Sequence, residues 1–458
     1  MDTRPNIILI NCDDLGWGDP SCYGHPRHST PHLDQMAAEG VRFTDFYMAS
    51  PVCSPSRGAM LTGCYPSRIG FGQFEGNWVL FPGQPVGLNP SETTIASALK
   101  RAGYRTRHVG KWHCGDQPEF LPTRHGFDGY FGIPYSNDMG RQVSKQEPGK
   151  PLRNAPPLPL LLDEEPIEVQ PDQAGLTARY VDDAIRFIRE KDDRPFFLYF
   201  AHMYVHLPIY VQERFLKESK NGPYGAAVAA IDWAAGMLFA ELRRLGIDEN
   251  TLVIFTSDNG SRNDFGDSNG PLRGKKGTNW EGGQRVPCIM RMPGTLPAGR
   301  EVAAHAAAID FLPTLAGLAG VDLNPEVPID GRDLWPLAVG NTDEAPRDAF
   351  AYYKLDNLCA VRNKRYKLHV HREGEAVREL YDLQEDIGET KNISDDNPDV
   401  VARLESLAEA IRQEVGDEVT GVAGHRRPLG RVPVGRRLTE FDPTHPYYAA
   451  EYDLGDRG

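Results

Sequence analysis

The stretch Asn6-Ile7-Ile8-Leu9-Ile10-Asn11-Cys12-Asp13-Asp14 is an apolar run that ends abruptly in two carboxylates. Runs of this length that are rich in β-branched residues are typical of buried strands. Similar runs follow at Thr106–Gly110, Pro195–Ala201, Thr251–Ser257 and Val286–Met292. Segments with helical spacing lie between them, at Thr30–Gly40, Ser91–Ala102, Ala174–Glu190, Tyr224–Leu245 and Asp310–Leu318. This alternation predicts an α/β fold, in which helices sandwich a large, mixed but mostly parallel sheet.

The chain of 458 residues is longer than a typical single domain, and its character changes near residue 341. We expect a large domain over residues 1–345 and a smaller α+β domain over residues 346–458. The smaller domain should contain an antiparallel sheet, one helix and an irregular tail from Gly416 onward. Its expected strands are Ala349–Val361, Tyr366–His371 and Arg378–Leu383, and its expected helix is Pro398–Val415. The proline-rich segment Gln142–Asp172 predicts a long surface excursion.

The overall charge excludes one class of partner. There are 64 acidic and 50 basic side chains, with a net charge of −14, and nucleic-acid binding needs a basic surface instead. A small anionic substrate still fits, because it responds to local charge in a pocket. No apolar stretch was expected to span a membrane, and no signal peptide precedes the first strand. These features predict a cytoplasmic protein, or a periplasmic or secreted one if a leader has been removed, and they leave its oligomeric state open.

Seven cysteines are scattered along the chain without metal-ligand spacing, and most are expected to be small buried residues. Cys53 is different, because Cys53-Ser54-Pro55-Ser56-Arg57 places it just before an expected helix start. Arg57 lies one turn later on the same helix face. A helix N-terminus and a guanidinium together stabilise an anion. The alternative is a buried cysteine near a surface arginine.

Oxygen ligands follow two of the expected strands. Asp13 and Asp14 end the first strand, and Asp258 and Asn259 follow Thr251–Ser257. In parallel sheets, ligands gather at the carboxyl ends of the strands. Adjacent carboxylates repel each other unless a cation lies between them. Three carboxylates and an amide oxygen predict a calcium or magnesium site and disfavour zinc.

Basic side chains follow other strands. Gly110-Lys111-Trp112-His113 places Lys111 and His113 two residues apart, while His202 and His206 follow Pro195–Ala201. The segment Arg273-Gly274-Lys275-Lys276-Gly277 adds two lysines. Each residue alone is more typical of a surface or structural role. Together they would neutralise a bound anion next to the metal.

Cys-x-Pro-Ser-Arg followed by Leu61-Thr62-Gly63 resembles the type I sulfatases, the formylglycine-dependent members of the alkaline phosphatase-like superfamily. Gly-Lys-x-His and the Lys-Gly…Glu-Gly-Gly-x-Arg-x-Pro segment ending at Pro287 match the same family. The segment Phe131–Asp138 resembles the arylsulfatase A and galactosamine-6-sulfatase branch. The resemblance extends from Pro5 to about Ile393.

The resemblance implies that a formylglycine-generating enzyme oxidises Cys53 to an aldehyde, whose hydrate is the nucleophile. It implies one divalent cation, calcium more than magnesium, held by Asp13, Asp14, Cys53, Asp258 and Asn259. Asp258 would also take a proton from the nucleophile, and a sulfo-enzyme would form. The implied roles of the other catalytic residues are leaving-group protonation by His206 with Lys276, proton removal by His113, and hydrate binding by Arg57 and Lys111. The implied substrate contacts are Ser136, Asn137, Asp138 and His202.

The resulting expectation is a sulfatase that hydrolyses sulfate monoesters of a sulfated carbohydrate and also small aryl sulfates. Two alternatives stay open at this stage. A phosphonate monoester or phosphodiester hydrolase of the same superfamily would use a similar site. A non-catalytic protein that binds sulfated glycans would keep the fold and lose the chemistry.

Overall fold

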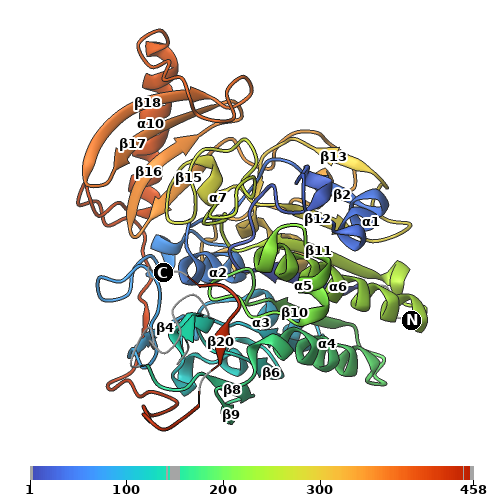
Figure 1. The fold of residues 1–458 in the computed structure, drawn as a ribbon. Helices are drawn as coiled ribbons and strands as arrows, with labels where there is room; N and C mark the ends of the chain where they lie inside the picture. The colour runs from blue at the N-terminus through green and yellow to red at the C-terminus, as the bar shows by residue number, and fades with distance from the viewer. Residues whose placement is uncertain (1–3, 141–142, 145–154, 447, 454–458) are drawn as a thin grey trace.

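A ten-stranded sheet forms the centre of the protein, whose computed structural model describes residues 4–140, 143–144, 155–446 and 448–453 (Figure 1). Across the sheet the strands are β13 (Arg300–Val302), β2 (Val41–Phe43), β12 (Cys288–Arg291), β11 (Thr251–Ser257), β1 (Asn6–Cys12), β10 (Phe196–Ala201), β5 (Arg105–Gly110), β6 (Gly129–Gly132), β8 (Pro159–Leu162) and β9 (Glu165–Val169).

The five central strands from β11 to β6 all run parallel. Antiparallel pairing occurs toward the margins, where β12 pairs with β11 and β2, and β8 pairs with β6 and β9. The predicted mixed, mostly parallel sheet is therefore confirmed. Because neighbouring parallel strands end at the same edge, the residues that follow β1, β5, β10 and β11 are brought together there.

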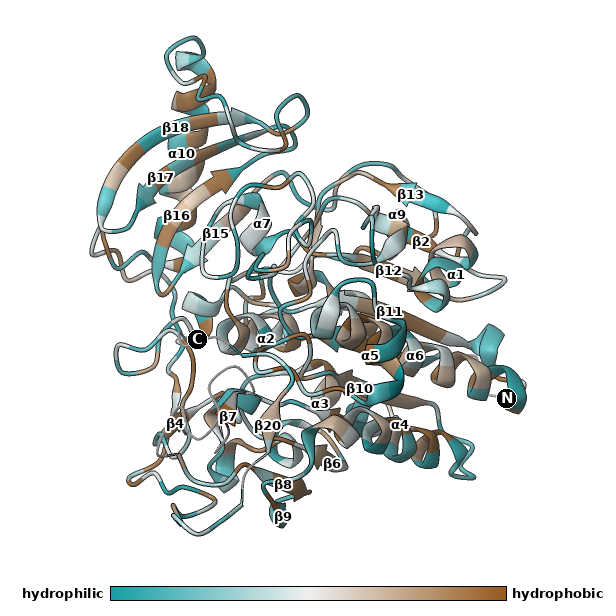
Figure 2. Cartoon of the chain, in the orientation of Figure 1, coloured by the Kyte–Doolittle hydropathy of each residue, from teal (hydrophilic) through white to brown (hydrophobic). Residues whose placement is uncertain are grey.

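Both faces of the sheet are covered by helices. Ile8 and Ile10 of β1 pack into a core with α1 (Pro31–Glu39), α4 (Gln173–Arg189) and α6 (Gly222–Leu245). Ile7 and Leu9 point to the opposite core, with α2 (Cys53–Thr62), α3 (Ile95–Arg101) and α8 (Phe311–Leu318). Alternating residues of a strand face opposite sides, so a strand covered on both faces is apolar throughout. Figure 2 shows this pattern as brown central strands, with teal on the outer turns of α4.

Helix α6 corrects one expectation from the sequence. By length and composition its 24 residues could cross a membrane, and it is the one such helix among the described residues. However, 78% of its apolar window is buried inside the protein, where the helix packs on α1 and α4. The run is apolar because the core surrounds it on several sides.

Two segments of the large domain differ from their predicted form. The helix expected over Ser91–Ala102 begins only at Ile95, because Thr94 and Ser97 form a reciprocal capping box. The excursion expected over Gln142–Asp172 is only partly described, and its second half forms the β8–β9 hairpin that extends the sheet. Pro166 in β9 is compatible with this position because β9 is an edge strand.

A four-stranded antiparallel sheet and helix α10 (Pro398–Val415) form the smaller lobe, drawn in orange in Figure 1. The strand predicted over Ala349–Val361 is two strands, β15 (Phe350–Lys354) and β16 (Asn357–Arg362), joined at Leu355 and Asp356. Leu355 has a φ of 56°, which a tight turn requires but an apolar sequence does not signal. The remaining strands are β17 (Tyr366–Arg372) and β18 (Glu375–Asp382).

The tail after Gly416 is mostly irregular, as predicted, but it leaves the smaller lobe and packs again on the large domain. Its short strands β19 (Gly430–Arg431) and β20 (Ala449–Ala450) pair with β4 (Val86–Gly87) and β7 (Val143–Ser144). Arg427 holds the returning chain through two hydrogen bonds to Glu92, at 2.8 and 2.9 Å. The boundary between residues 345 and 346 stays a prediction.

A buried ionic network joins the smaller lobe to the large one. Glu281, in the short helix α7 (Glu281–Gln284), accepts hydrogen bonds from Tyr352 at 2.8 Å and Lys367 at 3.0 Å. Lys367 also pairs with Glu389 at 3.0 Å, and all three charged side chains are fully buried. Burial tends to raise the pKa of Glu281, but Lys367, followed by Arg285, outweighs it and lowers the pKa to about 2. Glu281 is therefore held as a carboxylate between the lobes.

Replacing Lys367 by methionine should leave two buried carboxylates without their shared cation. We expect the free energy of unfolding to fall by about 3–5 kcal/mol, the typical cost of removing one partner from a buried ion pair. Urea denaturation followed by circular dichroism measures this change. The matched control is Lys364→Met, whose pair with Glu344 is about half exposed or more on both sides. It should cost less than about 1 kcal/mol, and equal losses in the two variants would contradict the importance of the buried network.

Candidate active site

Four strands deliver side chains to one edge of the large sheet. Asp13 and Asp14 follow β1, Lys111 and His113 follow β5, His206 lies beyond β10, and Asp258 and Asn259 follow β11. Register brings the two acidic segments together, because Cys12 pairs with Ser257 and the Asp258 amide donates to the Cys12 carbonyl at 3.0 Å. All seven side chains are buried.

Cys53 is the first residue of α2, and all ten residues of this helix are buried. Its Sγ lies 3.3 Å from Asp13 Oδ1 and 4.0 Å from Asp14 Oδ1. Burial, together with the charge of Asp13, raises the pKa of the thiol well above its usual value. The helix therefore presents Cys53 directly to the acidic cluster at the sheet edge.

The acidic cluster has the composition of a hard-cation site. Ligand atoms of Asp13, Asp14, Cys53 and Asp258 all lie within 4.8 Å of one another. Asn259 lies against this cluster, with its Nδ2 donating to Asp14 Oδ1 at 2.8 Å. Its Oδ1 is buried without a hydrogen bond among the described residues, which is the kind of oxygen that a cation would satisfy. The group can hold a divalent metal ion.

Three permanent cations balance the carboxylates. Arg57 Nε donates to Asp258 at 2.8 Å, Lys276 Nζ donates to Asp14 at 3.0 Å, and Lys111 Nζ donates to Asp13.

Their effect on the pKa differs between the acids. Burial alone would raise the pKa of Asp13, but Lys111, followed by His206 and Arg57, holds it well below its usual range. Burial and the charge of Asp13 instead raise the pKa of Asp258 to about 7. The two neighbouring acids therefore differ in their affinity for a proton.

His206 and Ser136 lie beside this charged group. His206 Nε2 is 3.3 Å from Ser136 Oγ and 4.0 Å from Asp14 Oδ2. Lys111 Nζ donates to Ser136 Oγ at 3.2 Å, so the hydroxyl bridges a lysine and a histidine. Burial, followed by the charge of Lys276, lowers the pKa of His206.

His113 follows Lys111 by two residues in the segment after β5. Its Nε2 lies 3.0 Å from the Leu80 carbonyl, which selects the tautomer with the proton on Nε2. Nδ1 is then an unprotonated nitrogen, and it is buried without a hydrogen bond among the described residues. Burial, followed by the charge of Lys111, lowers the pKa of His113. This nitrogen is a possible proton acceptor.

The structure agrees with the choice that the motifs made between neighbouring basic residues. Lys276 is buried in the site, whereas Lys275 is exposed. His202 is buried against the ring of Phe200, and burial alone lowers its pKa to about 3. The charged groups that act on His206 do not act on it.

Two further predicted substrate contacts lie near this histidine segment. Asn137 donates to Gln173 at 3.1 Å and to the Pro208 carbonyl at 2.9 Å, so its amide nitrogen supports the segment that carries His206. Asp138 is buried next to it in the chain. Of the residues predicted to contact the substrate, Ser136 is the one for which the described residues show hydrogen bonds to Lys111 and His206.

Two hydroxyls that support the site had no predicted role. Ser56 donates to the backbone carbonyl of Asp258, and Ser54 accepts from the Leu80 amide at 3.1 Å. Both lie in the quoted motif, and Ser56 is three residues after Cys53, hence on the same helix face. That spacing could have indicated a role for Ser56 in the sequence. The residues that Ser56 and Ser54 contact, however, are distant from them in the sequence.

Comparison with known proteins identifies relatives of this chain. The family model described as Sulfatase matches residues 5–321, and that described as N-sulphoglucosamine sulphohydrolase, C-terminal, matches residues 275–415. Human arylsulfatase A is 40% identical over 449 residues, covering 88% of this chain and 87% of its own. Dog N-acetylgalactosamine-6-sulfatase is 42% identical over 377 residues, covering 80% and 71%.

A solved structure agrees with these matches. The crystal structure of Ps i-CgsB in complex with k-i-k-neocarrahexaose superposes with a TM-score of 0.78 at 28% identity, covering 89% of this chain and 92% of that one. The resemblance to sulfatases, the predicted fold and the predicted enzyme class are thereby confirmed. The chain belongs to the sulfatase family, and it is a sulfuric ester hydrolase.

Proposed function

We propose that this enzyme hydrolyses sulfate monoesters of a sulfated carbohydrate, and small aryl sulfates, by means of a formylglycine made from Cys53. The observation that carries the proposal is the position of Cys53, with its Sγ 3.3 Å from Asp13 and inside a cluster that can hold a metal. Two relatives support the substrate class, since one is named N-acetylgalactosamine-6-sulfatase and another was solved in complex with k-i-k-neocarrahexaose.

The charges of the site suit an anionic ester. Without a metal, three carboxylates face three permanent cations. A divalent ion would leave the site with two excess positive charges, which a bound sulfate ester would partly neutralise. In a buried site such charges are screened little by solvent, so they favour the transition state strongly.

Asp13, Asp14, Asp258 and Asn259, with the modified Cys53, would hold one divalent cation. The donors are all hard oxygens, which favours calcium and allows magnesium. When bound, this ion would act as a Lewis acid toward the sulfate oxygens. Lys111 and Lys276, which hydrogen-bond to Asp13 and Asp14, would also bind these oxygens, together with Ser136.

Oxidation of Cys53 would replace a poorly ionised thiol with an aldehyde whose hydrate both attacks sulfur and later expels sulfate. Asp258 would accept a proton from one hydroxyl of the hydrate. His206 would donate a proton to the departing sugar oxygen, with Lys276 beside it. His113 Nδ1 would accept the second hydroxyl proton, and Arg57 and Lys111 would hold the hydrate.

Mass spectrometry of the tryptic peptide Phe43–Arg57 tests the origin of the nucleophile. Conversion of Cys53 to formylglycine should lower the mass of the peptide by about 18 Da. The adjacent peptide Gly58–Arg68 contains Cys64 and is the internal control, which should keep its unmodified mass. An unmodified Cys53 in fully active enzyme would show that the proposed nucleophile is wrong.

His206→Ala should affect substrates according to their leaving groups. Sugar sulfates need a proton on the departing oxygen, so we expect kcat/KM to fall about 10²–10⁴-fold. An activated aryl sulfate, whose phenolate leaves without a proton, should lose much less. His202→Ala is the matched variant and should change both substrates by a similar factor. Equal losses for both substrates in His206→Ala would contradict its role as the leaving-group acid.

Calcium binding can be measured without turnover. After treatment with a chelator, added calcium should raise the thermal unfolding midpoint, because a ligand that binds only the folded state stabilises it. Asn259→Ala should reduce this calcium-dependent shift, since it removes one oxygen ligand. The control Asn324→Ala alters an exposed asparagine far along the chain and should keep the full shift. A shift of the same size in both variants would exclude Asn259 as a ligand.

A further inference from the structure

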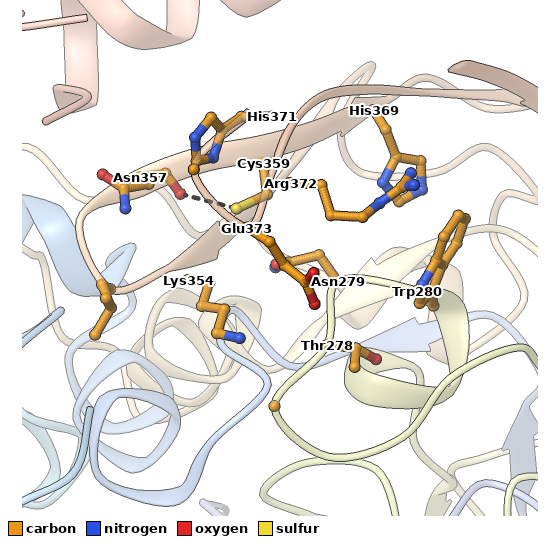
Figure 3. A pocket seen from close by; sticks show the side chains of 13 residues that line it. Thr278, Asn279, Trp280, Lys354, Asn357, Cys359, His369, His371, Arg372 and Glu373 are labelled. Carbon is orange, nitrogen blue, oxygen red and sulfur yellow. Dashed lines mark hydrogen bonds between the residues drawn. The ribbon is translucent and has the colours of Figure 1, made fainter. Parts of the chain in front are cut away.

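A second cavity, which we call the interdomain pocket, lies between the two lobes (Figure 3). Its walls are the loop Gly277–Trp280 of the large lobe, the β15–β16 turn, and the end of β17 with the turn that follows it. The cavity has a volume of about 180 Å³. Figure 3 shows Lys354, His371 and Glu373 from the smaller lobe, with Asn279 and Trp280 opposite.

The interdomain pocket shares two chain segments with the active site. Gly277 directly follows Lys276, and its amide donates to the Pro51 carbonyl at 2.9 Å, two residues before Cys53. The Nζ of Lys354 lies 5.7 Å from the ring centroid of Trp78. Two residues beyond Trp78, the Leu80 carbonyl contacts His113. The interdomain pocket and the active site are therefore connected through neighbouring residues of the same chain segments.

Two basic side chains of the pocket have unused binding capacity. His371 is 7% exposed, and neither ring nitrogen has a hydrogen bond within the described part of the chain. Lys354 forms no ion pair with a described carboxylate, and its recorded contact is the face of Trp78. An unpartnered buried imidazole is costly unless a ligand or water completes its hydrogen bonds.

The rest of the wall is already fixed. Arg372 pairs with Glu379, at 3.1 Å through Nη1, and stacks 4.3 Å from the Trp280 ring centroid. His369 pairs with Glu389 at 2.9 Å. These groups give a preformed shape, which reduces the entropy lost on binding.

The available groups define the ligand. Lys354 offers a charge for an anion, His371 can bond hydroxyls, and Asn357 adds an amide to the lining. Glu373 is exposed and is the one carboxylate that lines the pocket, so it also offers an acceptor for hydroxyl groups. A bare inorganic anion would use only the lysine. A sugar residue that carries one acidic group would use both the charge and the hydroxyl-binding groups.

We propose that the interdomain pocket binds an acidic sugar residue, either sulfated or a uronic acid, of an extended saccharide whose sulfate ester is cleaved at the active site. This proposal rests on the proposed function. A cavity of 180 Å³ is smaller than a typical pocket for a drug-sized ligand, and it suits a single sugar residue. The pocket would favour long acidic chains over single sugars by holding them at two points.

The test measures binding in a Cys53→Ala background, so that no turnover is needed. Isothermal titration compares acidic tetrasaccharides from chondroitin 6-sulfate and from carrageenan with their single sulfated sugars. We expect at least one tetrasaccharide to bind more tightly than its monosaccharide. Lys354→Gln or His371→Ala should reduce that ratio of affinities about tenfold, the typical effect of one charge-assisted hydrogen bond. Lys191→Gln alters an exposed lysine outside the pocket and should keep the ratio.

Three outcomes would overturn the proposal. The first is that no tetrasaccharide binds more tightly than its monosaccharide, and the second is that the pocket variants leave the ratio unchanged. The third is that Lys354→Gln weakens binding of inorganic sulfate by the same factor, which would identify a simple anion site. Failure of the proposed function is observed separately, as absence of aryl sulfate hydrolysis by the enzyme with converted Cys53.

Discussion

Mutual repulsion among Asp13, Asp14 and Asp258 is the constraint on which the site depends. The parallel pairing of β1 and β11 makes their carboxyl ends adjacent, and the Asp14 amide donates to Asp258 at 3.2 Å. Three buried carboxylates so close together would be strongly destabilising without compensation. The fold supplies one cation from α2, one from the end of β5 and one from the loop before α7. The same three cations therefore stabilise this edge of the sheet and form part of the active site.

The third of these cations explains why the smaller lobe matters for the chemistry. Lys276 lies in a loop that ends at α7, and Glu281 of α7 is held by Tyr352 and Lys367 of the smaller sheet. The Glu281 amide also donates to Glu389 at 2.7 Å. Lys276 lies in a loop, and loops are more mobile than strands and helices, so the contacts of Glu281 are needed to hold this lysine in place. The antiparallel sheet thus forms part of the scaffold for the active site.

The sequence predicted most of what depends on local pattern. The strands β1 and β11 were expected within their observed bounds, because strands buried on both faces are continuous apolar runs. Asp13, Asp14, Asp258, Asn259 and Lys111 were predicted at strand ends, while Arg57 and Lys276 were predicted from motifs elsewhere in the chain. Long-range contacts were harder to predict, since His202 was expected to contact the substrate but is buried against Phe200, which only the tertiary structure shows. The β8–β9 hairpin was missed for a related reason, because prolines on an edge strand resemble those of a loop.

The acidic surface and the anionic substrate are compatible because the two kinds of charge act over different distances. The net charge of −14 is spread over a large surface, and salt at physiological strength screens exposed charges beyond about 8 Å. Arg57, Lys111 and Lys276 are buried, so their attraction is screened much less. A sulfate ester that has reached the mouth of the site is therefore governed by these three cations and by any bound metal. For a longer acidic saccharide, Lys354, whose Nζ lies 5.7 Å from the Trp78 ring centroid, would add a further positive charge outside this group.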